Sequence, residues 1–263
     1  MEIKAIFFDI DGTLVPFGDH RPPQEVIEAI TALRARGIKV FVATGRHAVW
    51  IDNLDGIEFD GFVTANGSMC VESDRTTVTY SHPIAHEDVE RLMNAKADLD
   101  LEFCLVAEDG ENILTGINKN VKDVCSLINI PPIPVRPIES ICHKPIVQMM
   151  AFGEPEKWSS PLLYSDVLKS CSPTSWNPYF CDIIPKGSSK SKGIAKMLEI
   201  HGISRDNTMA FGDGDNDITM LEYCNVGVAM GNGSETVKAA ADYITDDCRD
   251  HGIINALTHF GIL

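Results

Sequence analysis

The sequence predicts an α/β protein, a Rossmann-like doubly wound parallel sheet that carries an inserted α+β domain. At both ends of the chain, short apolar runs alternate with stretches of helical spacing, as in βαβ units. The middle differs, because residues 83–184 contain ten of the fourteen prolines. A chain of 263 residues has the length of one or two domains. We therefore assign residues 1–82 and 185–263 to the sheet domain and 83–184 to the insert.

The first part of the sheet domain contains three predicted strands. The first is the apolar run 3–8, which leads directly into Asp9. A helix opened by two prolines follows, because apolar residues recur there at helical spacing: Val26, Ile27, Ile30 and Leu33. The other two strands are expected at 39–43 and 61–64, and the third leads into a turn at 65–68.

The same alternation returns after the insert. We expect, in order, a helix at 191–201, a strand at 208–211, a helix through Leu221, a strand at 226–230, a helix at 234–241, a strand at 243–245 and a helix at 253–260. Inside the insert, residues 146–152 resemble a strand that lies between helical stretches at 86–97 and 156–169. The two outer parts together form one discontinuous sheet domain.

Composition excludes several classes of partner. Lys and Arg number 22 and Asp and Glu 38, so the net charge is −16. This charge opposes binding to a nucleic-acid backbone or an anionic membrane surface. No apolar run approaches the roughly 18 residues of a membrane span, and the first residues do not resemble a signal peptide. We expect a cytoplasmic monomer that binds neither nucleic acid nor membrane.

Polar side chains gather where the predicted strands end, and ligands of open parallel sheets bind at that edge. The residues there are Asp9, Asp11, Thr44, Gly45, Asp213, Asn216 and Asp217. Converging carboxylates repel one another unless a cation lies among them, and Mg²⁺ prefers oxygen ligands and a substrate phosphate. Because neither Cys nor His accompanies these acids, zinc and copper are disfavoured. The sequence therefore predicts a magnesium site.

The pair Asp9 and Asp11 suggests phosphoryl chemistry. On an extended strand end, residues i and i+2 point the same way, so both carboxylates would face one site. One could then attack phosphorus while the other handles the proton of the leaving group. The alternative is a surface turn or a calcium-like loop, which fits poorly after an apolar strand.

Two further stretches suit an anion. Thr44 and Gly45 follow a buried strand and offer a hydroxyl and backbone N–H groups at a helix start, although an ordinary helix cap would look the same. Residues 186–192 hold three lysines, of which one could neutralise a phosphoryl group while the others are solvated.

Together these stretches resemble the haloacid dehalogenase (HAD) superfamily of phosphotransferases, in particular its Cof-like, class IIB sugar phosphatases. The four matching motifs, in order, are Asp9-Ile10-Asp11-Gly12-Thr13, Ala43-Thr44-Gly45-Arg46, Gly187-Ser188-Ser189-Lys190 and Gly212-Asp213-Gly214-Asp215-Asn216-Asp217. The insert falls where that branch has its cap domain. In the third motif, the small residues before Lys190 select it over Lys192.

The resemblance implies a role for each matching residue. Asp9 would be the nucleophile that forms an aspartyl-phosphate, and Asp11 would protonate the leaving alcohol and then activate water. Mg²⁺ would be held by Asp9, Asp213 and the backbone carbonyl of Asp11. The residues around the transferring phosphoryl group would be Thr44, Lys190, Asn216 and the N–H groups of Ile10 and Gly45, with Asp217 orienting Lys190 or a metal-bound water.

The resulting hypothesis is a Mg²⁺-dependent phosphatase of small phosphorylated metabolites, chiefly sugar (hexose) phosphates. Phe180 and Asp182, near the end of the insert, are candidates for substrate contact. Two alternatives remain open: a phosphosugar mutase of the same superfamily, and a non-catalytic phosphoacceptor or sensor such as a response-regulator receiver. The second acid, two residues after the first, and the long insert weigh against the receiver.

Overall fold

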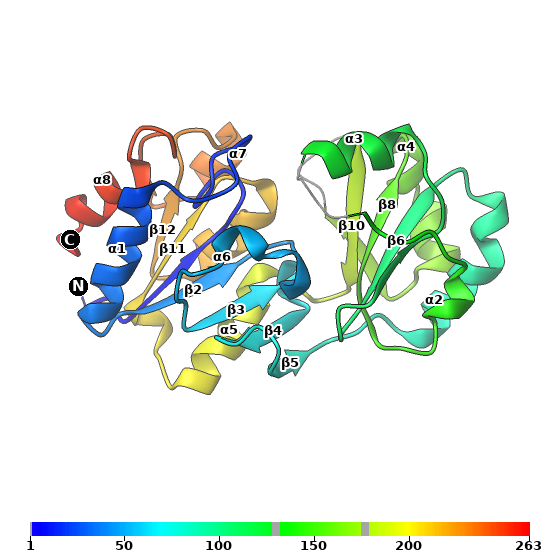
Figure 1. Cartoon of the computed structure of the whole chain (residues 1–263), viewed down its shortest axis with the longest axis horizontal. Coiled ribbons are helices and arrows are strands. Elements are labelled where there is room, and N and C mark those ends of the chain that lie inside the picture. Colours follow the sequence, from blue (N-terminus) through cyan, green and yellow to red (C-terminus); the bar gives the residue numbers. More distant parts are fainter. Residues whose placement is uncertain (1, 128–131, 175–178) are drawn as a thin grey trace. The chain divides into compact units, whose positions relative to one another are not determined.

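The computed structural model of the chain describes residues 2–127, 132–174 and 179–263. The chain divides into two compact units, shown in Figure 1. The core unit consists of Met1–Tyr80 and Ser189–Leu263, and the insert unit is Ser81–Ser188. No helix in the described ranges combines the length and the apolar character that crossing a membrane requires.

The core unit is built on an eight-stranded sheet in the order β13-β12-β11-β1-β2-β3-β4-β5. Its strands are β1 (Ala5–Phe8), β2 (Lys39–Ala43), β3 (Gly61–Thr64), β4 (Met69–Glu72), β5 (Val78–Ser81), β11 (Thr208–Gly212), β12 (Val226–Ala229) and β13 (Tyr243–Ile244). The pairs from β13 to β3 are parallel, and β4 runs antiparallel to β3. The predicted α/β fold with a large parallel sheet is therefore confirmed.

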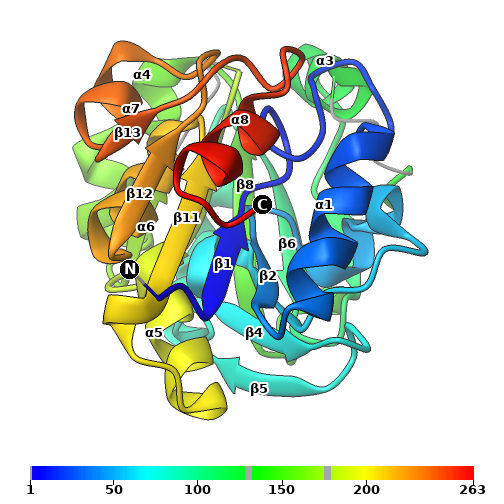
Figure 2. The ribbon, with the colours of Figure 1, turned by 90° about the vertical axis from the view of Figure 1, so that its left-hand side faces the viewer.

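Helices cover both faces of this sheet. The helices α1 (Gln24–Ala35) and α8 (Gly252–His259) contact each other and lie in front of the parallel strands in Figure 2. Residues of α5 (Lys190–His201), α6 (Ile218–Tyr223) and α7 (Glu235–Ala239) pack in one apolar cluster with Phe7, Phe41 and Val63 on the other face. This arrangement is the predicted double winding.

Burial on both faces explains why the central strands are continuous apolar runs. All four residues of β1 are buried. Phe7 and Phe8 point to opposite faces, where Phe7 stacks on Phe41 of β2 with ring centroids 4.9 Å apart and Phe8 stacks on Phe211 of β11 at 4.8 Å. The rings fix β1 between its two neighbours, and β1 leads into Asp9.

Helix α5 approaches the sheet closely at Gly193. A Cβ atom built on Gly193 would lie 2.3 Å from Cγ1 of Val63 and 3.0 Å from Cα of Gly67. We expect Gly193→Ala to lower the free energy of unfolding by about 1–3 kcal/mol through overpacking, although alanine is the better helix former. Chemical denaturation measures this value. Lys192→Ala, at an exposed position of the same helix, should change it by less than about 0.5 kcal/mol, and a stabilised Gly193→Ala would contradict the close packing.

The insert unit is an antiparallel five-stranded sheet in the order β7-β6-β8-β10-β9. Its elements are β6 (Glu102–Ala107), β7 (Asn112–Leu114), β8 (Ile146–Phe152), β9 (Cys171–Thr174) and β10 (Phe180–Pro185), with α2 (His86–Ala95), α3 (Lys119–Leu127) and α4 (Pro155–Trp158). Alternate residues of β6, β8 and β10 bury their side chains in one apolar cluster, which gives this unit its own core.

Two local predictions were wrong. The expected helix at 156–169 is instead the short α4 followed by a π-helical turn at Leu163–Val167. No α-helix begins after Thr44, because the described connection from β2 to β3 holds only two 3₁₀ turns, at Ala48–Trp50 and Asp52–Leu54. The sequence analysis also overlooked α3.

Candidate active site

Asp9 lies immediately after β1, at the edge where the parallel strands end. Its backbone N–H donates to the carbonyl of Phe211, and its side chain is buried. Lys190, the first residue of α5, is only 1% exposed and donates from Nζ to Oδ1 of Asp9 at 2.6 Å and to Oδ1 of Asp217. The structure thus joins three predicted site residues from three distant segments in one buried ion-pair cluster.

The loop after β11 supplies two carboxylates. Oδ2 of Asp217 accepts the backbone N–H groups of Asp213 and Gly214, each at 2.9 Å. Oδ1 of Asp213 accepts the hydroxyl of Thr13 at 2.8 Å. One carboxylate oxygen each from Asp9, Asp213 and Asp217 lies within 4.8 Å of the others.

Burial and mutual repulsion perturb these acids. Burial raises the pKa of Asp9 well above its ordinary value, and the charge of Lys190 opposes the rise. Burial, followed by the charge of Asp217, raises the pKa of Asp213 to about 7. Burial would lower the pKa of Lys190, but Asp217 and Asp9 outweigh it and the pKa lies above the ordinary value. The cluster therefore lacks positive charge.

A hard divalent cation would compensate this shortage of positive charge, because every atom of the group that could bind a metal is a carboxylate oxygen. Asp217 already accepts hydrogen bonds at both oxygens, from Lys190 and from two backbone N–H groups. Asp9 and Asp213 are therefore the side chains best placed to hold an ion. The carboxylate group that the structure brings together contains Asp217 beside Asp9 and Asp213. The backbone carbonyl of Asp11, which was the third predicted ligand, stays a prediction.

The side chain of Asp11 has a different partner. Nε and Nη2 of Arg46 donate to its two oxygens at 2.8 and 2.6 Å, and Nη1 of Arg46 donates to the carbonyl of Trp50. The argument from an extended strand end was wrong in detail, because β1 ends at Phe8 and Asp11 lies in a turn closed by Thr13 N–H to the Ile10 carbonyl. Arg46 belongs to the second matching motif, but the sequence analysis assigned it no role. Its pairing with Asp11 was not predicted because 35 positions separate the two residues.

The other residues predicted to bind the phosphoryl group lie at the same edge of the sheet, where the parallel strands end. Thr44 is buried and its Oγ1 accepts the N–H of Arg46 at 3.1 Å, while Ile10 is fully buried. Asn216 donates from Nδ2 to Oδ1 of Asn66 at 3.0 Å. A Cβ atom built on Gly45 would lie 3.2 Å from Nδ2 of Asn66. Asn66 is thus a second residue that the sequence analysis overlooked.

Phe180 and Asp182 lie in β10 of the insert unit. Phe180 is buried and stacks on Phe152 with ring centroids 6.1 Å apart. Asp182 is 4% exposed and accepts a hydrogen bond from Nε2 of Gln148 on β8 at 2.8 Å. Both have contacts inside the insert unit, and their contact with substrate stays a prediction.

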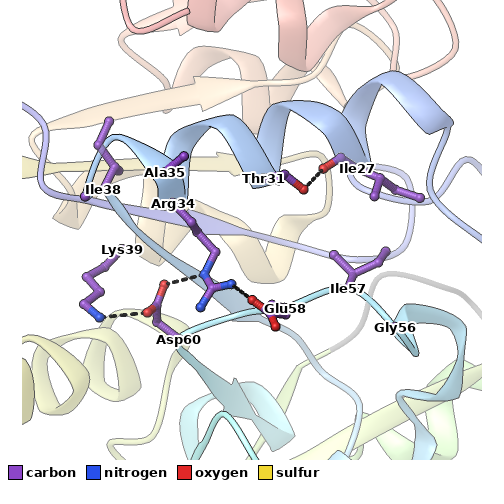
Figure 3. Close-up of a pocket in the computed structure, with 11 residues that line it drawn as sticks. Ile27, Thr31, Arg34, Ala35, Ile38, Lys39, Gly56, Ile57, Glu58 and Asp60 are labelled. Carbon is purple, nitrogen blue, oxygen red and sulfur yellow. Dashed lines mark hydrogen bonds and ion pairs between the residues drawn. The ribbon is translucent and has the colours of Figure 1, made fainter.

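A cavity of about 590 Å³ lies at the other edge of the core sheet, where β2 begins (Figure 3). Its cations are already paired with acids in its own lining. Arg34 pairs with Glu58 and Asp60, and Lys39 pairs with Asp60 at 2.8 Å. Because its cations are already paired with acids, this cavity is a poorer candidate for a phosphate-binding site than the edge of the sheet that carries Asp9.

Comparisons with known proteins identify the family of the chain. The family model of haloacid dehalogenase-like hydrolases matches residues 6–257. A solved structure of BT4131, a HAD subclass IIB sugar phosphatase, is 37% identical with a TM-score of 0.89 over 99% of this chain and 100% of its own. YkrA of Bacillus subtilis (strain 168) is 30% identical over all of both chains. The pyridoxal phosphate phosphatase YbhA of Escherichia coli (strain K12) is 26% identical over 94% of both.

The family match spans nearly the whole chain, including all four motif regions and the insert. The strands that lead into Asp9 and Asp213 are parallel neighbours, and the two side chains meet at one edge of the sheet. The chain therefore belongs to the haloacid dehalogenase-like hydrolases, and it is an enzyme of the phosphatase type within that superfamily.

Proposed function

We propose that this phosphatase hydrolyses small phosphorylated metabolites, chiefly sugar phosphates, with Mg²⁺ and through an aspartyl-phosphate on Asp9. The observation that carries the proposal is the buried carboxylate of Asp9, held by Lys190 beside Asp213 at the end of the parallel strands. The sugar phosphate class is supported by the similarity to BT4131, which is a sugar phosphatase.

In the first step, a carboxylate oxygen of Asp9 attacks phosphorus, and the bond from phosphorus to the leaving oxygen breaks. Lys190 lies against this carboxylate, so its charge can offset the negative charge that gathers on the phosphoryl oxygens. The hydroxyl of Thr44 and the amide of Asn216 are further donors at this edge.

Asp11 handles the protons in both steps. Its carboxyl group gives a proton to the leaving alcohol, and the resulting carboxylate takes one from the water that attacks the aspartyl-phosphate. That second step releases inorganic phosphate and restores Asp9 and the protonated Asp11. The two-pronged contact with Arg46 fixes the direction of Asp11 in its carboxylate form, the form that accepts the proton from water.

Asp9 and Asp213 are the side chains that would hold Mg²⁺, with the backbone carbonyl of Asp11 as a further ligand. The ion would supply positive charge to the carboxylate cluster and to the substrate phosphate. Affinity for substrate has to come from these local groups, because a net charge of −16 provides no long-range attraction for an anion.

A panel of phosphomonoesters tests the proposal. We expect hexose and pentose phosphates to give the highest kcat/KM with millimolar Mg²⁺, and activity to disappear in EDTA and return when Mg²⁺ is added. Release of inorganic phosphate is the measurement. Full activity in metal-free buffer would contradict the magnesium site, and isomerisation of a sugar phosphate stimulated by a sugar bisphosphate would identify a mutase instead.

A further inference from the structure

The turn Ala65–Gly67, between β3 and β4, has an unusual backbone. Its three residues have consecutive positive φ angles of 49°, 51° and 85°. Side chains other than glycine rarely adopt this region, and alanine has no polar group that would favour it. Residues held in such a conformation are maintained by their surroundings and cluster at functional sites.

Backbone hydrogen bonds join this turn to the loop after β2. The N–H of Ala65 donates to the carbonyl of Arg46 at 3.0 Å, and the N–H of Asn66 donates to the carbonyl of Thr44 at 3.1 Å. The turn therefore holds the loop that carries Thr44 and Gly45, two residues of the proposed phosphoryl site.

The turn also packs against the start of α5. A Cβ atom on Gly67 would lie 1.9 Å from the carbonyl oxygen of Ser189 and 3.1 Å from the backbone nitrogen of Lys190. Only glycine permits this approach with a positive φ. The backbone at Lys190, whose side chain contacts Asp9, is therefore packed directly against the turn.

The side chain of Asn66 completes a third connection. It is 2% exposed, and its Oδ1 accepts a hydrogen bond from Nδ2 of Asn216 at 3.0 Å. The Oδ1 of Asn216 lies toward Gly214, since a Cβ there would be 2.7 Å from it. When Nδ2 of Asn216 faces Asn66, the second N–H of the same amide remains available to donate to a bound anion. In the flipped orientation, the amide would turn its oxygen toward that anion.

We propose that Asn66 is a positioning residue of the phosphoryl site, which fixes the amide of Asn216 so that it donates to the phosphoryl group. The left-handed turn places Asn66 between the Thr44 loop and the loop of Asn216. This inference rests on the proposed function for its catalytic consequence, but the hydrogen bond between the two asparagines can be tested separately.

The test uses Asn66→Gly, because glycine accepts a φ of 51° and the substitution removes only the side chain. We expect kcat on a hexose phosphate to fall about 10- to 100-fold, with KM changed less than about threefold and the unfolding temperature retained. Asn66→Asp keeps the acceptor oxygen but adds a negative charge near the phosphoryl group, so it should not restore kcat. His251→Gly, at an exposed left-handed position with a φ of 63°, is the matched control and should leave kcat unchanged.

A double-mutant cycle separates positioning from general damage. If Asn66 acts through Asn216, then Asn66→Gly should change kcat less than about twofold in an Asn216→Ala background. Effects that multiply, or an Asn66→Gly enzyme with wild-type kcat, would overturn the proposal.

The side-chain amide signals of Asn216, assigned in ¹⁵N-labelled protein by their loss in Asn216→Ala, give a readout without turnover. We expect both signals to shift and to exchange faster with solvent in Asn66→Gly, and unchanged signals would refute the contact. If the wild-type protein shows the contact but hydrolyses no phosphomonoester, then the proposed function fails and the contact stands.

Discussion

Asp9→Asn is expected to lower kcat on a sugar phosphate by at least about 10⁴-fold while the protein remains folded, because an amide cannot attack phosphorus. The substitution is nearly isosteric, and Lys190 keeps its second partner, Asp217. The site should therefore lose its nucleophile without losing its shape. Steady-state kinetics and thermal unfolding of the variant measure the two parts of this expectation.

A matched control is Asp206→Asn, an exposed carboxylate of the core unit, which should retain the wild-type kcat within about twofold. Acid quenching of the enzyme with ³²P-labelled substrate should trap a phosphoenzyme in the wild type and none in Asp9→Asn. Retention of more than about a hundredth of the wild-type kcat, or a labelled variant, would show that Asp9 is not the nucleophile.

Prediction from the sequence succeeded for elements whose own residue pattern indicates their structure. The strand that ends before Asp9 is a buried apolar run, as expected for a strand covered on both faces in a parallel sheet. Because parallel strands end at one edge, the convergence of Asp9 and Asp213 followed from their positions at two strand ends. The family resemblance added the order of the four motifs.

The sequence failed where a residue's role depends on a partner far along the chain. Arg46 pairs with Asp11 across 35 positions, and Asn216 contacts Asn66 across 150. No local pattern encodes such pairs, although the Asn66-Gly67 dipeptide did signal a turn. The insert was also less predictable, since α3 was overlooked and the helical spacing at 156–169 belongs to the short α4 and a separate π-helical turn.

Lys190→Ala should lower both activity and stability. Its Nζ lies between two buried carboxylates, so its loss leaves Asp9 and Asp217 without their shared cation. Breaking a buried ion pair in this way costs about 3–5 kcal/mol of unfolding free energy, and added Mg²⁺ should recover part of it by binding near Asp9. We expect kcat on a hexose phosphate to fall by about 10³-fold or more, because the lost charge lies where the phosphoryl group carries its negative charge.

Lys192→Ala is the matched control for this loss. Lys192 lies two residues further along the same helix, but its side chain is exposed, and it has the same charge. If the net positive charge of this segment attracted the substrate, then both variants would lose kcat/KM alike. If a single buried ammonium group acts on the phosphoryl group, then Lys192→Ala should retain kcat within about twofold and Lys190→Ala should not. Kinetics measured well below each variant's unfolding temperature decide between these outcomes, and equal losses would remove Lys190 from the site.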